Sequence, residues 1–387
     1  MKINKFKMQP SAKSFYASLK ELNDTRSVAG KRHDLAFVLC GFILGVMSNR
    51  KKRASVHRFM KNNHDFLCKV TNFAAKTTIS NPQLGRLLRT LNVKELNEVV
   101  YAHYGVEISE LSDGEWVSVD GKDLRGSIDV RESSRGEVLV HGVRHSDKKI
   151  VAESFYQGDK ESEKLAVREM LKQTGLESKS VTLDALHTDP TTLEQIAGHN
   201  GQYIVQVKEN QKELTKDLGS KVKRLESFGG LKEVDKAHGR LEQRAYDFYN
   251  IEGCVFEKRW APCRLSTLIV VNRYFEELKS GKIMSEQSFY ISNVSIVENT
   301  QSKIENLAQG VRGHWTIENV NQIRDVSFKE DDIKMKRGNY AKAFAVCVSL
   351  AFACLNQIKP ANFIATMEGF ADDKGAFGGG LRQINFL

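Results

Sequence analysis

Two aspartates stand where they could do chemistry together. Asp120 ends the alternating apolar run WVSVDG, and Asp184 ends a second such run, SVTLDAL. Acids placed alike on two strands of one sheet can converge on a shared cation, and Mg²⁺ prefers carboxylate, water and phosphate oxygens. The residues alone leave two other interpretations open. Asp120 with Gly121 could form a turn, and both acids could be unrelated strand-end caps.

A third acid, Glu318, lies in the polar segment VRGHWTIENVNQIRDVSFKEDD. If this segment is helical, His314 and Glu318 lie four residues apart on one face, and Asp325 lies on that same face. A His and a Glu at this spacing could bind zinc, but the HExxH pattern of zinc hydrolases is absent. The alternative is that His314 and Trp315 are only a buried polar and aromatic pair.

Several basic residues are candidates for contact with phosphate. Arg50, Lys51, Lys52 and Arg53 form a run that could touch phosphate or could be a solvated helix end. Lys208 and Asn210 directly follow the apolar run YIVQV, where turn chemistry would use the same residue types. The residues alone assign no chemistry to Arg240 in the string HGR.

The elements that must position these residues follow from periodicity. Residues 11–105 show helical spacing of apolar residues, including a helix start with Asn81 as N-cap. After Gly114, three short β-branched runs predict antiparallel strands, and helix, strand, helix and strand follow. The order βββαβαβ predicts an α/β fold, a mixed sheet flanked by helices. Strand-like runs then occupy most of 215–291, and residues 300–358 are again helical.

Composition limits the class of protein. The chain has 387 residues and a formal charge of +10, which favours a polyanionic partner. The apolar run Leu35–Met47 is shorter than the roughly 20 residues that cross a bilayer, and the first residues lack a signal-peptide pattern. The six cysteines are scattered, which favours buried free thiols over zinc or disulfides. We therefore expect a multi-domain cytoplasmic protein with no membrane segment.

Six sequence blocks carry a resemblance to a known family. RHDLAFVLCGFILGVM with ISNPQLGRLLRTLN is similar to its helical N-terminal domain, and VSVDGKDLRGS, VTLDALHT, YIVQVKENQKEL, HGRLEQR and RGHWTIEN follow in the family's order. The chain resembles, over nearly its full length, the bacterial insertion-sequence DDE transposases of the ISAs group, which includes the H-repeat-associated proteins. One such block would be weak evidence, whereas the ordered set is specific.

The resemblance implies an RNase H-like fold in which Asp120, Asp184 and Glu318 are catalytic and hold two Mg²⁺ or Mn²⁺ ions. It implies double-stranded DNA as the partner, both the terminal inverted repeats of the transposon and the target, bound by a homodimer or higher oligomer near the bacterial nucleoid. DNA contacts are then expected from Lys122, Arg125, Lys208, Asn210, Arg240, Arg312 and His314, and from the N-terminal run Arg50, Lys51, Lys52 and Arg53.

The resemblance also implies a division of the chain. We expect an N-terminal helical DNA-binding domain at 1–105 and a first catalytic part at 106–214. A β-rich insertion at 215–291 would separate it from the helical catalytic part at 292–358, which carries Glu318. The Gly-rich end, 359–387, is expected to be a loosely held tail.

Two alternatives to an active transposase stay open. The segment after Glu318, VNQIRDV, departs from the family's pattern and lacks its second His-Trp pair. This motivates a transposase-derived protein that binds DNA without cutting it. An RNase H-like nuclease or resolvase is the other alternative, although the separate N-terminal domain argues against it because a structure-selective nuclease needs no sequence reader.

Overall fold

The computed structural model describes residues 13–27, 31–128, 136–158, 162–237, 240–297, 300–332 and 339–387. Its helices are α1 (Phe15–Leu19), α2 (Leu35–Met47), α3 (Arg53–Asn62), α4 (His64–Thr71), α5 (Asn81–Thr90), α6 (Val93–Tyr104), α7 (Glu163–Thr174), α8 (Pro190–Gly198), α9 (Lys212–Val222), α10 (Thr300–Gly313), α11 (Trp315–Val326), α12 (Tyr340–Ile358), α13 (Phe363–Asp372) and α14 (Lys374–Gln383). Its strands are β1 (Trp116–Asp123), β2 (Glu137–Arg144), β3 (Ile150–Gln157), β4 (Ser180–Leu183), β5 (Gln202–Val207), β6 (Gly229–Ala237), β7 (Arg240–Asn250), β8 (Thr267–Glu277) and β9 (Lys282–Ser292).

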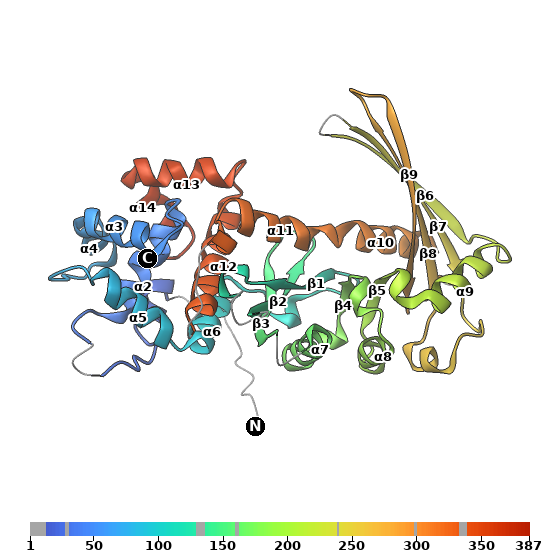
Figure 1. Ribbon diagram of the computed structural model, residues 1–387, viewed down its shortest axis with the longest axis horizontal. Helices are drawn as coiled ribbons and strands as arrows, with labels where there is room; N and C mark the ends of the chain where they lie inside the picture. The colour runs from blue at the N-terminus through green and yellow to red at the C-terminus, as the bar shows by residue number, and fades with distance from the viewer. Residues whose placement is uncertain are drawn as a thin grey trace.

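The described strands form one mixed sheet in the order β3-β2-β1-β4-β5-β9-β8-β7-β6. β1, β2 and β3 pair antiparallel, whereas β1, β4 and β5 run parallel to one another. The predicted order βββαβαβ and the mixed α/β sheet of an RNase H-like fold are confirmed. Helices α7 and α8 cover one face of the sheet, and α10 and α11 cover the other (Figure 1).

Side-chain alternation along β1 and β4 assigns the two faces of the sheet. Val117 and Val119 of β1, with Val181 and Leu183 of β4, are fully or almost fully buried in the core under α7 and α8. Because successive side chains of a strand point to opposite faces, Ser118, Asp120 and Thr182 face α10 and α11. The polar residues of these strands therefore share the face that α11 covers.

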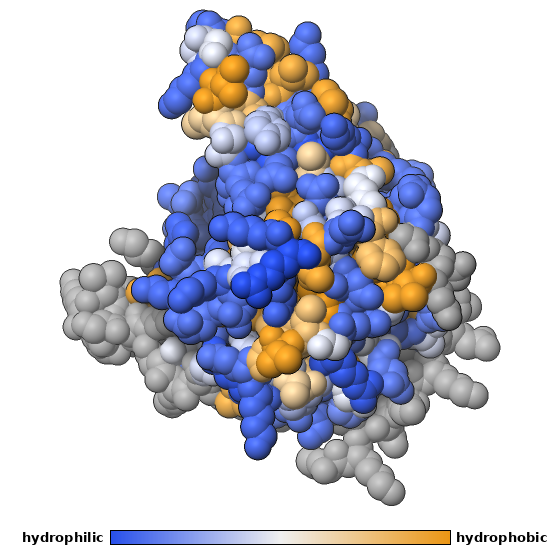
Figure 2. All heavy atoms as spheres, turned by 90° about the vertical axis from the view of Figure 1, so that its right-hand side faces the viewer, coloured by the Kyte–Doolittle hydropathy of each residue, from blue (hydrophilic) through white to orange (hydrophobic). Residues whose placement is uncertain are grey.

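The four strands β6 to β9 extend the sheet beyond β5 and project from the molecule as an arm (Figure 1). Antiparallel pairing of β5 with β9 joins the arm to the rest of the sheet. Apolar side chains are visible on the projecting arm in Figure 2. Val234, Tyr274 and Ile283 of the arm strands are 67%, 48% and 70% exposed. The predicted strand-rich character of 215–291 is thus present, although α9 occupies its first residues.

The N-terminal helices share one core with the end of the chain. Residues of α2, α5 and α6 pack with α12, α13 and α14 in a single cluster of buried side chains. The helix α5 begins one residue earlier than predicted, since the hydroxyl of Ser80, not Asn81, accepts the capping bond from the Gln83 N–H.

The expectation that residues 359–387 form a loosely held tail is wrong. Residues 363–383 form α13 and α14, and Phe377 and Phe386 are fully buried. Apolar residues therefore outweigh the Gly-rich composition of this segment, because burying them offsets the conformational entropy that the glycines lose.

One described helix, α12, is long and apolar enough to cross a membrane by length and composition. Inside the protein, 72% of its apolar window is buried. It packs against α2, α5 and α6 on one side and against β2 and β3 on the other. α12 therefore has the character of a core helix that joins the N-terminal bundle to the sheet.

Candidate active site

Asp120 and Asp184 lie side by side because their strands are parallel neighbours. Val119 of β1 pairs with Leu183 of β4, and an acid follows each of these two residues in the chain. The structure therefore brings these two predicted site residues together where β4 ends. The expectation that Asp120 ends its own strand is wrong, because β1 continues to Asp123. The Asp184 side chain is 45% exposed and accepts a hydrogen bond from the Leu186 N–H at 3.0 Å, which holds it at the edge of the sheet.

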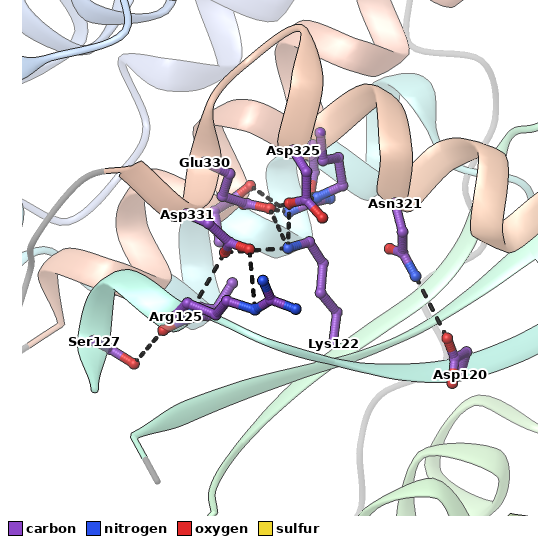
Figure 3. Close-up of polar contacts among 12 residues, drawn as sticks. Asp120, Lys122, Arg125, Ser127, Asn321, Asp325, Glu330 and Asp331 are labelled. Atoms are coloured by element: carbon purple, nitrogen blue, oxygen red, sulfur yellow. Dashed lines mark hydrogen bonds and ion pairs between the residues drawn. The ribbon is translucent and has the colours of Figure 1, made fainter. Parts of the chain in front are cut away.

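Glu318 lies in the first turn of α11, an exposed position on the helix that crosses this face of the sheet. His314 is the N-cap residue of α11. Its Nδ1 lies 3.0 Å from the Thr182 Oγ1, and the Ser118 hydroxyl donates to the His314 carbonyl at 3.3 Å. One turn beyond Glu318, the Asn321 amide donates to Asp120 at 3.4 Å (Figure 3). α11 thus holds Glu318 on the face of the sheet where Asp120 of β1 and Asp184, which follows β4, lie side by side.

The carboxylates affect one another's protonation. Burial, then the neighbouring charges of Asp184 and Glu163, raise the pKa of Asp120 to about 7. Partial burial raises the pKa of Glu318 while Lys208 opposes the shift, and Asp184 raises it further. Burial is the largest cause of both shifts, and the like charge of Asp184 adds to each, because a neighbouring negative charge disfavours ionisation.

A fourth acid, Glu163, was missed by the sequence analysis. It is the first residue of α7, and its carboxylate lies against Gly121, where an added Cβ would come within 2.5 Å of the carboxyl carbon. Buried His187 places its Nε2 at 3.4 Å from Glu163 and at 3.9 Å from Asp184. The signal in the sequence was Gly121 itself, since a glycine directly after an acid permits close approach to the strand.

The donor chemistry fits a hard divalent cation. Asp120, Asp184, Glu318 and Glu163 offer only carboxylate oxygens, and a divalent cation would relieve their mutual repulsion. Within the described residues, however, no three acidic, histidine or cysteine side chains lie close enough to share one metal ion in this conformation. The residues therefore fit the ion by chemistry, and its coordination geometry stays a prediction.

Two residues predicted to contact DNA instead bind other residues inside the protein. The Lys122 side chain is 7% exposed and pairs with Asp325 at 2.6 Å, so it cannot reach a phosphate. Burial lowers the pKa of His314 to about 4, which leaves its ring neutral at pH 7 and bonded to Thr182. Both predictions are corrected, because strand and helix periodicity put these side chains under α11 and not in solvent.

Four other predicted contacts lie at or near the surface. Lys208 is exposed and its charge acts on Glu318, and the Arg125 side chain is 76% exposed. The Arg312 side chain is 40% exposed and lies 3.5 Å from Asp235 of the arm. Asn210 is exposed, but its amide donates to the Ala185 carbonyl at 2.6 Å and so ties together the loops after β5 and β4. DNA contact by these residues stays a prediction.

The N-terminal basic run lies between α2 and α3. Arg50 and Lys52 are exposed, and Lys51 is half-buried. The Arg53 Nε donates to the Asn81 Oδ1 at 3.0 Å, which links α3 to α5. The side chain of Arg240, the first residue of β7, lies outside the described part of the chain, as does all of His238.

The described cysteines are all unpaired, as the sequence predicted. Cys40, Cys263, Cys347 and Cys354 are buried, and burial raises the pKa of the Cys263 and Cys347 thiols to about 12. Thiolates at these positions are strongly disfavoured at neutral pH, so these two cysteines are inert packing residues.

Comparison with known proteins agrees with this geometry. A family model described as "Transposase DDE domain" matches residues 113–354, and one described as "DDE_Tnp_1-associated" matches residues 16–104. "Putative transposase YncI" of Escherichia coli O157:H7 is 23% identical over 90% of this chain and 89% of its own length. "H repeat-associated putative transposase YhhI" of E. coli strain K12 is 24% identical over 87% of this chain and 88% of its own length.

The domain match spans the sheet, the arm and α10 to α11, so it contains Asp120, Glu163, Asp184 and Glu318. The associated match spans the helical bundle that packs on α12. The resemblance expected from the sequence is confirmed over both parts. The chain belongs to the DDE transposase family, in the group that includes the H repeat-associated proteins.

Proposed function

We propose that this protein cuts DNA at the ends of an insertion sequence and joins the freed ends to target DNA. Water would break a phosphodiester bond at the transposon end and leave a 3′-hydroxyl. That hydroxyl would then attack a target phosphodiester, forming one P–O bond as another breaks. The observation that carries the proposal is the paired placement of Asp120 and Asp184 after Val119 and Leu183, under the helix that bears Glu318.

Each acid would have a role set by its position. Asp120, Asp184 and Glu318 would together hold two Mg²⁺ or Mn²⁺ ions, with Asp120 the most buried of the three. Bound divalent cations supply Lewis-acid stabilisation of the charge that develops on the attacking and leaving oxygens. Lys208 beside Glu318 would bind a DNA phosphate and orient the strand, because its exposed ammonium already lies in the field of the acids.

The DNA would be held by positive charge outside this acidic site. Arg125 and Arg312 are accessible near the two ends of α11, and Arg50, Lys51 and Lys52 lie on the N-terminal bundle. The formal charge of +10 supports association with a polyanion. We propose the bundle as the reader of the transposon ends, residues 106–214 with 292–358 as the catalytic domain, and 215–291 as its insertion.

Substitution of the acids tests the proposal. Asp120→Asn, Asp184→Asn and Glu318→Gln should each abolish Mg²⁺-dependent cleavage of DNA that carries the element's own inverted repeats, while leaving end binding intact. Glu305→Gln is the matched control, because Glu305 is an exposed acid on α10 next to α11. A variant that still cuts at the wild-type rate would exclude its residue from the catalytic set.

A DNA-binding protein without cleavage activity is the second candidate. It is favoured by one observation, that no three metal-binding side chains among the described residues lie close enough to share an ion. Such a protein would bind the inverted repeats with steep salt dependence but would cut them with neither Mg²⁺ nor Mn²⁺. The same cleavage assay on the wild-type protein therefore separates the two functions.

A further inference from the structure

α11 contacts the two acid-bearing strands at regular intervals. At its start, His314 bonds to Ser118 and Thr182, each two residues before an acid. In its middle, Asn321 donates to Asp120 itself. At its end, Asp325 pairs with Lys122, two residues after Asp120. The helix is thus fixed in one register along the sheet.

The strongest of these contacts lies at the end of α11. The Lys122 Nζ lies 2.6 Å from Asp325, 3.3 Å from Asp331 and 3.7 Å from Glu330, with its side chain only 7% exposed (Figure 3). Asp331 and Glu330 belong to the short helical turn that follows α11. Lys122 therefore joins β1 to α11 and to the turn that ends it.

A second buried cation fixes the same end of α11 from the other side. Arg324 is fully buried and forms two hydrogen bonds to Glu330, at 3.0 and 2.7 Å. It also donates to Ser349 of α12 at 2.6 Å and to Glu153 of β3 at 3.3 Å. Lys122 and Arg324 thus share Glu330, and the network connects the sheet, α11 and α12.

A buried ionic network is a costly way to gain stability. Apolar residues of similar volume often stabilise as well or better, because they need no desolvation of charge. Ionic contacts are directional, however, and so they specify a register. A slip of α11 by one residue would move Glu318 by about 1.5 Å and rotate it by about 100°, which would turn it away from Asp184.

We propose that Lys122 and Asp325 form a latch that sets the register of α11 and so places Glu318 opposite the two aspartates. The two latch residues are positioning residues, since they act on the site through the helix. The inference rests on the proposed function, because it assigns the latch to the metal-binding geometry of Asp120, Asp184 and Glu318.

Asp325→Ala is the informative variant. Its side chain is 40% exposed, and Lys122 keeps Asp331 and Glu330 as partners when Asp325 is lost, so the chain should still fold. We expect cleavage at saturating DNA to fall about a hundredfold, the loss typical of a misplaced reacting group. The Mn²⁺ concentration that half-saturates thermal stabilisation should rise about tenfold, while affinity for end DNA is unchanged. Asp325→Glu, which retains the carboxylate, should restore most of both properties.

Lys342→Met is the matched control. Lys342 of α12 pairs with Glu137 of β2 at 3.0 Å, a partly buried helix-to-sheet ion pair that does not involve α11. This variant should cost stability comparable to that of Asp325→Ala and leave the Mn²⁺ response and cleavage at wild-type levels.

The outcomes separate the latch from the proposed function. If the wild-type protein neither cuts DNA nor is stabilised by Mn²⁺, the proposed function fails. If the wild-type protein does both and Asp325→Ala matches it at every Mn²⁺ concentration, the latch is overturned and the ion pair only stabilises the fold. Loss of cleavage in both Asp325→Ala and Lys342→Met, in proportion to lost thermal stability, would overturn it as well.

Discussion

At the residue scale, the site gathers carboxylates that repel one another. Burial of Asp120, together with the neighbouring charges of Asp184 and Glu163, raises its pKa to about 7. Placing like charges side by side costs stability, and such clusters are common at sites that bind a ligand of opposite charge. Glu163 belongs to this group by position, because the absence of a side chain at Gly121 lets its carboxylate lie against β1.

Glu163→Gln tests that assignment. Removing one negative charge should lower the pKa of Asp120 and weaken the attraction of the site for a divalent cation. We expect the Mn²⁺ concentration needed for half-maximal cleavage to rise about tenfold, the size of effect seen for groups just outside a metal's own ligands. End binding in the absence of metal should not change.

Glu169→Gln provides the comparison for this variant, since Glu169 is exposed on the same helix. Metal titrations of the two variants and the wild type, done side by side, test whether Glu163 contributes to metal binding. An identical titration for Glu163→Gln and Glu169→Gln would mean that Glu163 serves only as an acidic residue in the first turn of α7.

At the element scale, the junction of α10 and α11 decides where Glu318 lies. A single residue, His314, separates the two helices. The junction rests on His145 of the loop after β2, whose Nε2 lies 2.7 Å from the Ser118 hydroxyl and 3.2 Å from Thr182. The close packing of the junction on His145 requires glycine at position 313, because a Cβ there would lie 2.0 Å from the His145 ring.

Gly313→Ala should therefore separate the junction from the sheet. The backbone and a packed ring would have to move, which costs about 1–3 kcal/mol for an overpacked site. Urea unfolding followed by circular dichroism would measure the loss. Strand cleavage should fall more than stability alone explains, because the displaced junction carries Glu318 with it.

Gly369→Ala is the control for that substitution. Gly369 lies inside α13 with no atom within 4 Å of an added Cβ. Alanine there should stabilise the protein by about 0.5–1 kcal/mol, since it restricts the unfolded chain and favours helix. Equal effects of the two substitutions on the free energy of unfolding would contradict the packing argument at Gly313.

At the whole-molecule scale, the two ends of the described chain hold each other. The N–H groups of Phe15 and Tyr16 donate to the carbonyls of Asn385 and Phe386 at 3.0 and 2.9 Å. The ring centroids of Phe15 and Phe386 lie 5.1 Å apart, and both side chains are fully buried. The C-terminal helices therefore complete the N-terminal bundle that we propose as the DNA reader.

Phe386→Ala should destabilise that bundle strongly. Truncation of a fully buried phenylalanine costs about 3–5 kcal/mol. Thermal unfolding and affinity for inverted-repeat DNA would both be measured, and both should decrease. Phe228→Ala, at a position that is 46% exposed, should change stability by less than about 0.5 kcal/mol. A stable Phe386→Ala protein would show that the last residues are dispensable for the bundle.

Some features were determined by the sequence alone because they depend on local order. Period-two and helical apolar patterns predicted β1 to β5 with their helices. Acids after two predicted strands made a meeting of Asp120 and Asp184 one of several interpretations, and the family resemblance then implied it. The glycines near the C-terminus led to the wrong prediction of a loosely held tail, because buried phenylalanines hold that segment in the core. Local pattern shows which residues are apolar, but not which surface they will meet.

Other features were decided only by the tertiary structure, because they depend on contacts between residues far apart in the chain. Whether a lysine at 122 faces DNA or a carboxylate depends on where α11 crosses β1, some 200 positions later in the sequence. The same holds for Glu163, whose approach to Asp120 requires α7 to pack on the sheet beside Gly121. The sequence by itself thus predicted the acids and the strands that carry them, whereas helix packing across the sheet decided which charged residues face the site and which hold it in place.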